Sequence, residues 1–161
     1  MAEESVITDE MRSLIGVESE PSTFVVEKEP IRRWAEAIGN PNPLYRDEEY
    51  ARKSRYGEMI APSGFVGNYF FPIKVGGPPP RVPSPFWRVF NGGNEYEFLK
   101  PVRAGDVLTS TTKLSDLYER QGRPGIGRMI FQVLETTYKN QKGEVVVKTR
   151  GTGISYEGPT E

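Results

Sequence analysis

The residues best suited to chemistry lie in the segment Gly39–Asp47, which reads Gly-Asn-Pro-Asn-Pro-Leu-Tyr-Arg-Asp. Two X-Pro steps keep its backbone extended and non-helical. A stiff polar segment of this kind can hold side chains over a pocket, where Asn40 and Asn42 could form hydrogen bonds and Tyr45 could exchange a proton. The same residues could instead serve only as a rigid connector between two helices, and local composition leaves both interpretations open.

The absence of two residue types narrows this chemistry. None of the 161 residues is His or Cys, which removes the commonest general acid/base, the commonest metal ligand and every thiolate nucleophile. Any catalysis by this chain must therefore use carboxylates, Tyr, Lys, Ser, Thr or backbone dipoles, or it must belong to another chain. We expect no metal ion and no other cofactor.

Charge and hydropathy exclude further classes of function. The net charge is −1 and both signs are interspersed, so the chain has no electrostatic footprint for nucleic acid. No apolar run is long enough to span a bilayer and no secretory signal opens the chain, so we expect a cytoplasmic protein without membrane contact. The length fits one domain, which we place at residues 21–157, between an N-terminal tail or arm at 1–20 and a C-terminal tail at 158–161.

Two predicted helices flank the Asn-Pro segment and must position it. Residues 31–38 carry apolar side chains on one helical face, and residues 47–54 begin with an acidic cap and first turn. A first strand is predicted at Thr23–Glu27, which is rich in β-branched and aromatic residues. From residue 86 onward the pattern is typical of strands, which we place at 87–90, 95–99, 107–114, 127–138 and 144–156.

Between the helices and the strands lies a segment, at about residues 62–75, that is apolar on nearly all sides. Pro62 favours a helix start and Pro72 would kink or end the helix, so we predict a buried helix here. A sheet of long strands needs an apolar cover for one face, and this helix is the candidate. The predicted fold class is therefore α+β, a hot-dog fold with an antiparallel sheet wrapped around a central helix. Because exposed long strand edges are a liability, we expect dimerisation.

Most of residues 22–156 resemble the MaoC-like acyl dehydratases and (R)-specific enoyl-CoA hydratases, in the branch called FAS1-like or N-terminal MaoC dehydratase. Five stretches carry the resemblance in the right order. They are 31–38, Gly39–Asp47, Tyr50-Ala51, Ile60–Phe65 and Pro101–Asp106. The family resemblance implies the hot-dog fold and a reaction in which water adds across the double bond of a 2-enoyl thioester.

Two departures from the family pattern fall on the reacting groups. The family motif has the form Gly-Asp-x-Asn-Pro-Leu-His-x-Asp, and here Asn40 stands at the catalytic Asp and Tyr45 at the catalytic His. An amide does not titrate usefully, and a phenol, whose pKa is ordinarily about 10, is a poor base near neutrality. In the family's second motif, Ile-Ala-His-Gly, Pro62 and Ser63 replace the last two residues, although Gly64 could serve as the glycine.

The resemblance therefore implies a degenerate unit that works beside a catalytic one. We expect no catalytic residues in this chain, which would shape the acyl channel of a heteromeric (R)-specific enoyl-thioester hydratase or 3-hydroxyacyl-thioester dehydratase. The substrate would be an acyl-CoA or an acyl-carrier thioester, bound by Asn42, Ser63, Gly64, Phe70 and Trp87. The expected partner is a catalytic MaoC-type hot-dog subunit or a second copy, in a dimer or a heterotetramer.

Other interpretations of the same residues stay open. The chain could be an active homo-oligomeric hydratase or thioesterase that uses Tyr45 or a carboxylate, or an acyl-thioester-binding module without turnover. Asn40 and Tyr45 could merely fix the turn, Asn40 by an Asx-type bond and Tyr45 by packing. Phe70 and Trp87 could belong to an ordinary core.

Overall fold

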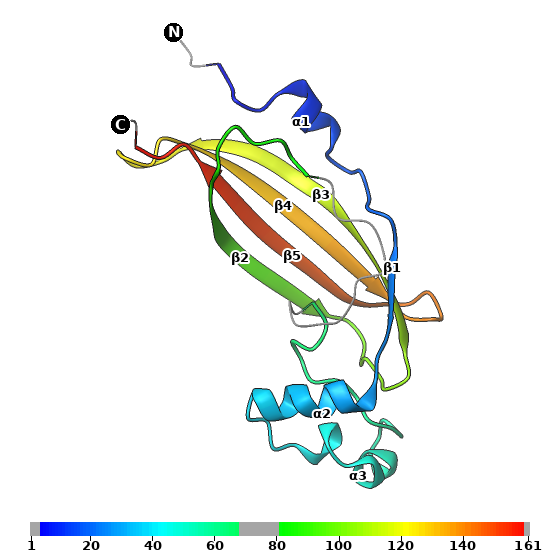
Figure 1. Cartoon of the computed structure of the whole chain (residues 1–161). Helices are drawn as coiled ribbons and strands as arrows, with labels where there is room; N and C mark the ends of the chain where they lie inside the picture. Colours follow the sequence, from blue (N-terminus) through cyan, green and yellow to red (C-terminus); the bar gives the residue numbers. More distant parts are fainter. Residues whose placement is uncertain (1–3, 68–80, 160–161) are drawn as a thin grey trace.

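The computed structural model describes residues 4–67 and 81–159 and is built on one antiparallel sheet of order β1-β3-β4-β5-β2 (Figure 1). The strands are β1 (Ser22–Val25), β2 (Arg88–Phe98), β3 (Val107–Gln121), β4 (Arg128–Lys139) and β5 (Val145–Tyr156). The helical elements are α1 (Asp9–Ser13), α2 (Lys28–Ala37), the 3-10 turn η1 (Pro43–Tyr45) and α3 (Glu48–Lys53). Helices α2 and α3 lie together beyond one end of the sheet, and α1 lies beside β3 towards the other end (Figure 1).

Strands β3, β4 and β5 follow one another in the chain and pair as a meander, whereas β1 and β2 are added at the two edges from earlier in the sequence. The sheet has three register shifts. One lies near its end, between Tyr138 and Lys139 of β4, and the other two are bulges within the sheet, between Asn91 and Gly93 in β2 and between Leu114 and Asp116 in β3. The two bulges lie opposite each other across β4 and β5. The sheet is therefore bent along one line.

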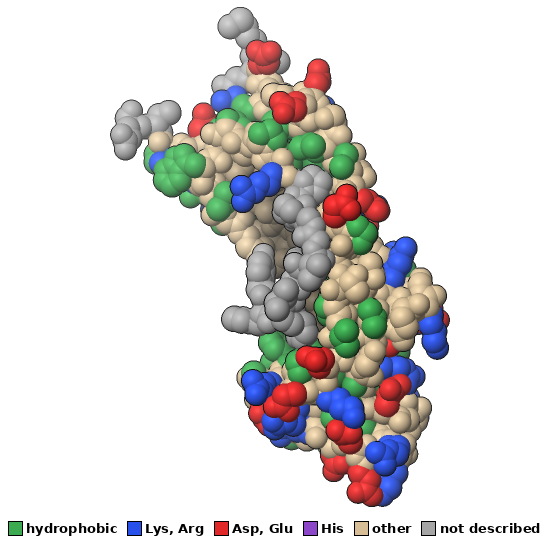
Figure 2. Space-filling model, turned by 45° about the vertical axis from the view of Figure 1, so that its right-hand side comes forward, with side chains coloured by type: hydrophobic (Ala, Val, Ile, Leu, Met, Phe, Trp, Pro, Cys, Tyr) green, Lys and Arg blue, Asp and Glu red, His purple; other side chains and the backbone are tan. Residues whose placement is uncertain are grey.

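Local chemistry explains where the helices begin. The side chain of Thr8 accepts the backbone N–H of Met11 in a reciprocal cap at the start of α1. Asp47 accepts the N–H groups of Glu49 and Tyr50 and so caps α3. Lys, Arg and Glu residues of α2 and α3 form exposed ion pairs, and Figure 2 shows both charge signs interspersed over that end of the molecule. Exposed pairs contribute little, so apolar packing must stabilise these short helices.

Two clusters of buried side chains form the core. The larger one joins Ile31 of α2 and Phe65 to Leu108 of β3, and all three are fully buried. The smaller one packs Met11 of α1 against Leu114 of β3. Leu108 and Leu114 lie on the same face of β3, because they are six positions apart in a regular stretch of strand, and side chains an even number of positions apart point the same way. Both clusters therefore cover one face of the sheet.

The predicted strands are present, but two of them differ in extent. Residues 87–90 and 95–99 belong to one continuous strand, β2, because the bulge at Asn91/Gly93 takes up the Gly-Gly sequence without ending the strand. Strand β3 continues beyond Leu114 to Gln121. The bulge after Leu114 shifts the alternation by one residue, which hid the last seven residues of β3 from the sequence pattern.

The helix predicted at about 62–75 does not begin at Pro62. Residues 62–67 form turns, with Gly64 at φ +85° and Gly67 at φ +86°. This is the left-handed backbone region, which glycine adopts easily and which interrupts an α-helix. Residues 68–75 lie outside the described residues, so the central helix itself stays a prediction. In the described ranges no helix is long and apolar enough to cross a membrane.

The buried Tyr138 makes the stability of the fold depend on pH in the alkaline range. Burial, with a smaller contribution from the nearby Tyr96, raises the pKa of Tyr138 to about 12. An unfolded tyrosine has a pKa of about 10. Below pH 10 both states are neutral at this site; above it the unfolded chain ionises first, so stability falls as the pH rises from 10 to 12.

We therefore expect the free energy of unfolding of the wild type to fall by up to about 2–3 kcal/mol more than that of Tyr138→Phe over pH 10–12. Urea titrations at each pH measure the difference. The control Tyr50→Phe, at a residue that is 53 % exposed, should parallel the wild type. Parallel profiles for Tyr138→Phe would contradict the assignment.

Candidate functional site

The Asn-Pro segment lies between α2 and α3, as predicted, and its side chains hold its own turns. The Oδ1 atom of Asn40 accepts a hydrogen bond from the N–H of Asn42 at 3.0 Å, and Oδ1 of Asn42 accepts one from the N–H of Leu44 at 3.0 Å. Both are Asx-type bonds, but the segment is not extended throughout as predicted, because the 3-10 turn η1 begins at Pro43. Asn42 also caps η1. Both amide oxygens are thus engaged in shaping the segment.

Tyr45 follows these turns and lines a cavity of about 310 Å³ beside the end of the sheet. Its ring is half-buried and packs against the larger core cluster. Tyr56 and Ser63 contribute hydroxyl groups to the same cavity, and Phe98 and Val147 contribute apolar walls from β2 and β5. The cavity therefore brings together groups from four separate parts of the chain.

A short ladder between two loops builds this cavity. The N–H of Ala61 donates to the carbonyl of Val102 at 2.8 Å, and the N–H of Ala104 donates to the carbonyl of Met59 at 2.9 Å. The guanidinium of Arg103 donates to the carbonyl of Tyr56 at 2.6 Å. These bonds attach the loop before Pro62 to the loop between β2 and β3. They bring Ser63 and Tyr56 to the cavity that Phe98 also lines.

The chemistry open to the cavity is binding rather than proton abstraction. Its polar side chains include the hydroxyls of Tyr45, Tyr56 and Ser63, which can donate hydrogen bonds to a carbonyl or amide. Among the described residues that line it there is no carboxylate, and the chain contains no His. A carboxylate and imidazole acting together on a water molecule have no counterpart in this lining.

Lys100 is the cation of the cavity and is already engaged. Its Nζ lies 2.5 Å from a carboxylate oxygen of Glu144. The hydrogen bond from Lys100, followed by one from Asn140, lowers the pKa of Glu144. Glu144 is therefore held in its ionised form beside the ammonium group of Lys100. In the part of the chain that the structure describes, no cluster of acidic residues could hold a metal ion.

The predicted site residues are only partly brought together. Tyr45 and Ser63 meet in the cavity, whereas Asn42, Gly64 and Trp87 are not among its lining residues. Trp87 is 78 % exposed and lies at the other end of β2, where the guanidinium of Arg88 stacks on it at 4.4 Å. The turn at residues 62–67 also means that Ser63 and Gly64 do not form a helix N-terminus. Phe70 lies outside the described residues.

Two aromatic residues of the cavity, Tyr56 and Phe98, were not predicted from the sequence. Both flank stretches that resemble the family's motifs, since Tyr56 precedes Ile60–Phe65 and Phe98 precedes Pro101–Asp106. If the two motifs form one site, they must lie close together in space, and the residues just before each motif then become candidates for the lining of that site.

Asp106 is the residue that fixes the second of these motifs. It is 5 % exposed, and its carboxylate accepts the N–H of Arg103 at 2.8 Å and the amide of Gln141 at 3.0 Å. We expect Asp106→Ala to lower the free energy of unfolding by about 2–3 kcal/mol, because it strands two donors. The matched variant Asp106→Asn keeps one acceptor oxygen and should lose about half as much. Urea unfolding measures both, and equal losses would contradict this role.

The fold and the arrangement of the site define a class of protein, and comparison with known proteins names the family. The family model described as "FAS1-like, dehydratase domain region" matches residues 13–149. The chain therefore belongs to the FAS1-like dehydratase family, which confirms the resemblance predicted from the sequence.

Two relatives illustrate the family. The chain is 35 % identical over 115 residues to a UPF0336 protein of Streptomyces avermitilis, which covers 69 % of this chain and 75 % of the relative. It is 28 % identical over 134 residues to a probable enoyl-CoA hydratase alpha subunit of Thermomonospora curvata, which covers 74 % of this chain and 41 % of that protein.

Solved structures confirm the hot-dog fold. The ChsH1-ChsH2 complex of Mycobacterium tuberculosis matches with a TM-score of 0.73 at 19 % identity and covers 94 % of this chain and 90 % of the other. The HadBC complex of the same organism, a 3R-hydroxyacyl-ACP dehydratase, matches at 0.67 and 23 % identity over 88 % and 97 % of the two chains. A MaoC-like dehydratase from Rhodospirillum rubrum matches at 0.65 and 23 % identity over 91 % and 94 %.

Proposed function

We propose that this chain is the non-catalytic, channel-shaping subunit of a heteromeric (R)-specific enoyl-thioester hydratase or 3-hydroxyacyl-thioester dehydratase. The observation that carries the proposal is the composition of the cavity. It contains Tyr45 and Ser63, from the two stretches that resemble the family's motifs, and offers hydroxyl groups and apolar walls, whereas its described lining contains no carboxylate and the chain no imidazole. A site that keeps its walls and lacks an acid and base suits binding, with the chemistry supplied by another subunit.

In this arrangement the apolar side chains and the hydroxyl groups of the cavity would bind different parts of the substrate. Phe98 and Val147 would contact the acyl chain, while the hydroxyls of Tyr45 and Ser63 would donate to the thioester carbonyl or to an amide of the pantetheine arm. Asn42 acts indirectly, by holding the turn that presents Tyr45. The thioester would be carried by coenzyme A or by an acyl carrier, and no other cofactor is needed.

The sheet provides a place for the partner. Strand β2 has β5 on one side and no strand on the other among the described residues, so one row of its backbone N–H and C=O groups is available for pairing. Two of the structures with the same fold are complexes of two different chains. A catalytic hot-dog subunit, or a second copy of this chain, would extend the sheet across β2 in a dimer or heterotetramer.

The isolated chain tests the proposal directly. Purified alone, it should not hydrate a crotonyl-type thioester above the buffer rate, as followed by loss of the enoyl absorbance. Calorimetry on the same sample should show saturable binding of the thioester. Robust hydration by the chain alone would overturn the non-catalytic role.

A second candidate is an active hydratase or thioesterase, and the presence of Tyr45 in the cavity is the observation in its favour. It requires turnover by the isolated chain that disappears in Tyr45→Phe. A third, a thioester-binding module without turnover, requires binding but no hydration even in the presence of a catalytic MaoC-type subunit.

A further inference from the structure

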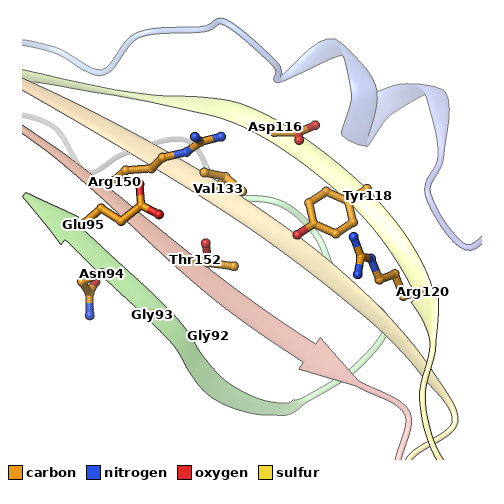
Figure 3. Close-up of a pocket in the computed structure, with 10 residues that line it drawn as sticks. All are labelled: Gly92, Gly93, Asn94, Glu95, Asp116, Tyr118, Arg120, Val133, Arg150 and Thr152. Atoms are coloured by element: carbon orange, nitrogen blue, oxygen red, sulfur yellow. The ribbon is translucent and has the colours of Figure 1, made fainter.

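The face of the sheet turned away from α1 is apolar in its central strands. On β4, Ile130 points to the α1 side and is fully buried, so Phe131 and Val133 point to the opposite face. Figure 3 looks onto this opposite face, with α1 behind the sheet. A strand that is apolar on both faces is typical of a sheet covered on both sides. The core covers one side, and we call the other the outer face.

An aromatic row crosses the outer face. Tyr118, Phe131, Ile154 and Phe90 are register neighbours on four successive strands. The rings of Tyr118 and Phe131 stack with centroids 4.8 Å apart. Phe90 is 43 % exposed. Ile154 is buried, and the guanidinium of Arg120 lies over the rings of Tyr118 and Phe131 at 5.2 and 5.7 Å, so Phe90 contributes the most exposed apolar area of the row.

A charged row runs parallel to it. Lys113, Glu135, Arg150 and Glu95 are register neighbours across the same four strands, so the charge alternates in sign from β3 to β2. Lys113 and Glu135 are 3.6 Å apart, but in the described part of the chain neither Arg150 nor Glu95 forms an ion pair. Half of the row therefore has opposite charges beside it but makes no close ion pair within the sheet.

Between the two rows the outer face is hollowed. The hollow has a volume of about 660 Å³ and follows the bend at the two bulges, with Val133 and Thr152 at its centre and Gly92 at its β2 side. A Cβ atom at Gly92 would lie 2.8 Å from a methyl carbon of Ile154, so any larger residue here would force the side chain of Ile154 to move. The side chains of Glu95 and Arg150 border the hollow (Figure 3).

We propose that the outer face binds a second copy of this chain, related by a twofold axis parallel to the strands and passing between β4 and β5. Such an axis reverses the order of strands from one copy to the other. Glu135 then faces Arg150 of the second copy, and Lys113 faces its Glu95, so that every charge in the row meets its opposite. An axis across the strands would instead set like charges against each other.

The hollow and the aromatic row agree with this geometry. Sheets pack face to face about 10 Å apart with strands about 30° from parallel, which leaves little room for two opposed rows of long charged side chains. The hollow beside the charged row supplies that room. The same axis sets the aromatic row against itself. It would also set Arg120 against Arg88 of the second copy, so the contact ends at the aromatic row.

This surface is independent of the proposed function. It shares strands β2 and β5 with the thioester cavity but none of the cavity's lining residues, and it does not use the free backbone edge of β2. A chain that pairs with a catalytic subunit across β2 could therefore also associate through its outer face, which would join two such pairs.

Two single charge reversals test the geometry. In Arg150→Glu the mutated residue faces Glu135 of the second copy, and in Glu135→Lys it faces Arg150. Each reversal creates two symmetry-related like-charge contacts, so each variant alone should associate on the order of a hundredfold more weakly than the wild type. An equimolar mixture should regain association, because the two reversals face each other with opposite charge. Sedimentation equilibrium measures the affinities, and native mass spectrometry identifies the mixed species.

Lys148→Glu is the matched control. It is an exposed reversal of the same sign on the same strand and face, but the axis sets it against Thr137, so its association should stay near that of the wild type. The milder Arg150→Gln should weaken association by a smaller factor in the same direction. If the charges of the row only attract one another within one sheet, the reversals will lower the melting temperature of the protein and leave its association state unchanged. That result, or a mixture that fails to regain association, would overturn the proposal.

Discussion

A complex of this chain with a hot-dog subunit that carries the family's Asp and His is expected to hydrate a crotonyl-type thioester at least about 10²–10⁴-fold faster than the isolated chain does. Each general acid or base usually contributes a factor of this size, and the described lining of the cavity in this chain holds neither a carboxylate nor an imidazole. The measurement is the initial rate of the isolated chain against that of a co-purified complex with a subunit encoded in a neighbouring reading frame.

Tyr45 separates this outcome from catalysis by the chain itself. In the complex, Tyr45→Phe removes one hydroxyl from the wall of the cavity, so it should reduce turnover by less than about tenfold, the value of a single hydrogen bond. If Tyr45 were the base, the same change should cost the full factor of about 10²–10⁴. Asn40→Asp in the isolated chain should leave turnover undetectable, because an Asp there can accept the same N–H of Asn42 and remain part of the turn.

The largest effect on stability is expected from Phe65→Ala. Phe65 is fully buried and belongs to the cluster that joins α2 to the sheet. Truncating a buried Phe removes its burial energy and leaves a cavity, which typically costs about 3–5 kcal/mol. Urea unfolding should show a lower midpoint at an unchanged slope. The turn at residues 62–67 loses its anchor at the same time, so thioester binding should weaken as well.

Phe98→Ala is the matched control, since it is the same chemical change at a residue that is 46 % exposed. It should lower the free energy of unfolding by less than about 1.5 kcal/mol, while still affecting the acyl wall of the cavity. Equal losses from both variants would contradict the anchoring role of Phe65.

Local patterns predicted the parts of the fold that depend on local chemistry. The acidic residue Asp47 marked the start of α3. The segment before it was predicted to be extended, but it contains the 3-10 turn η1, which begins at Pro43. Alternation of apolar residues located β4 and β5 to within a residue or two. The family motifs then supplied the topology that alternation alone does not give.

What the sequence did not provide depends on contacts between distant segments. The apolar residues around Phe65 fit a helix as well as a turn, and the positive φ values of Gly64 and Gly67 decide in favour of a turn. Trp87 was expected at the thioester because aromatic residues often line acyl channels, but strand β2 holds it at the opposite end from Phe98. The cavity itself combines four segments, so no single stretch could reveal its lining.

The order of strands in the sheet has a consequence for synthesis on the ribosome. Both edge strands are made first, and the partner of β2 is the last strand, whose end at Tyr156 comes about 60 residues after Phe98. At about 5–20 residues per second, β2 waits about 3–12 s without its neighbour. Its aromatic residues are separated by Gly92, Gly93, Glu95 and Glu97. Glycines and charged residues disfavour aggregation of an exposed, unfolded strand, so the bulge that bends the finished sheet also protects the unfinished one.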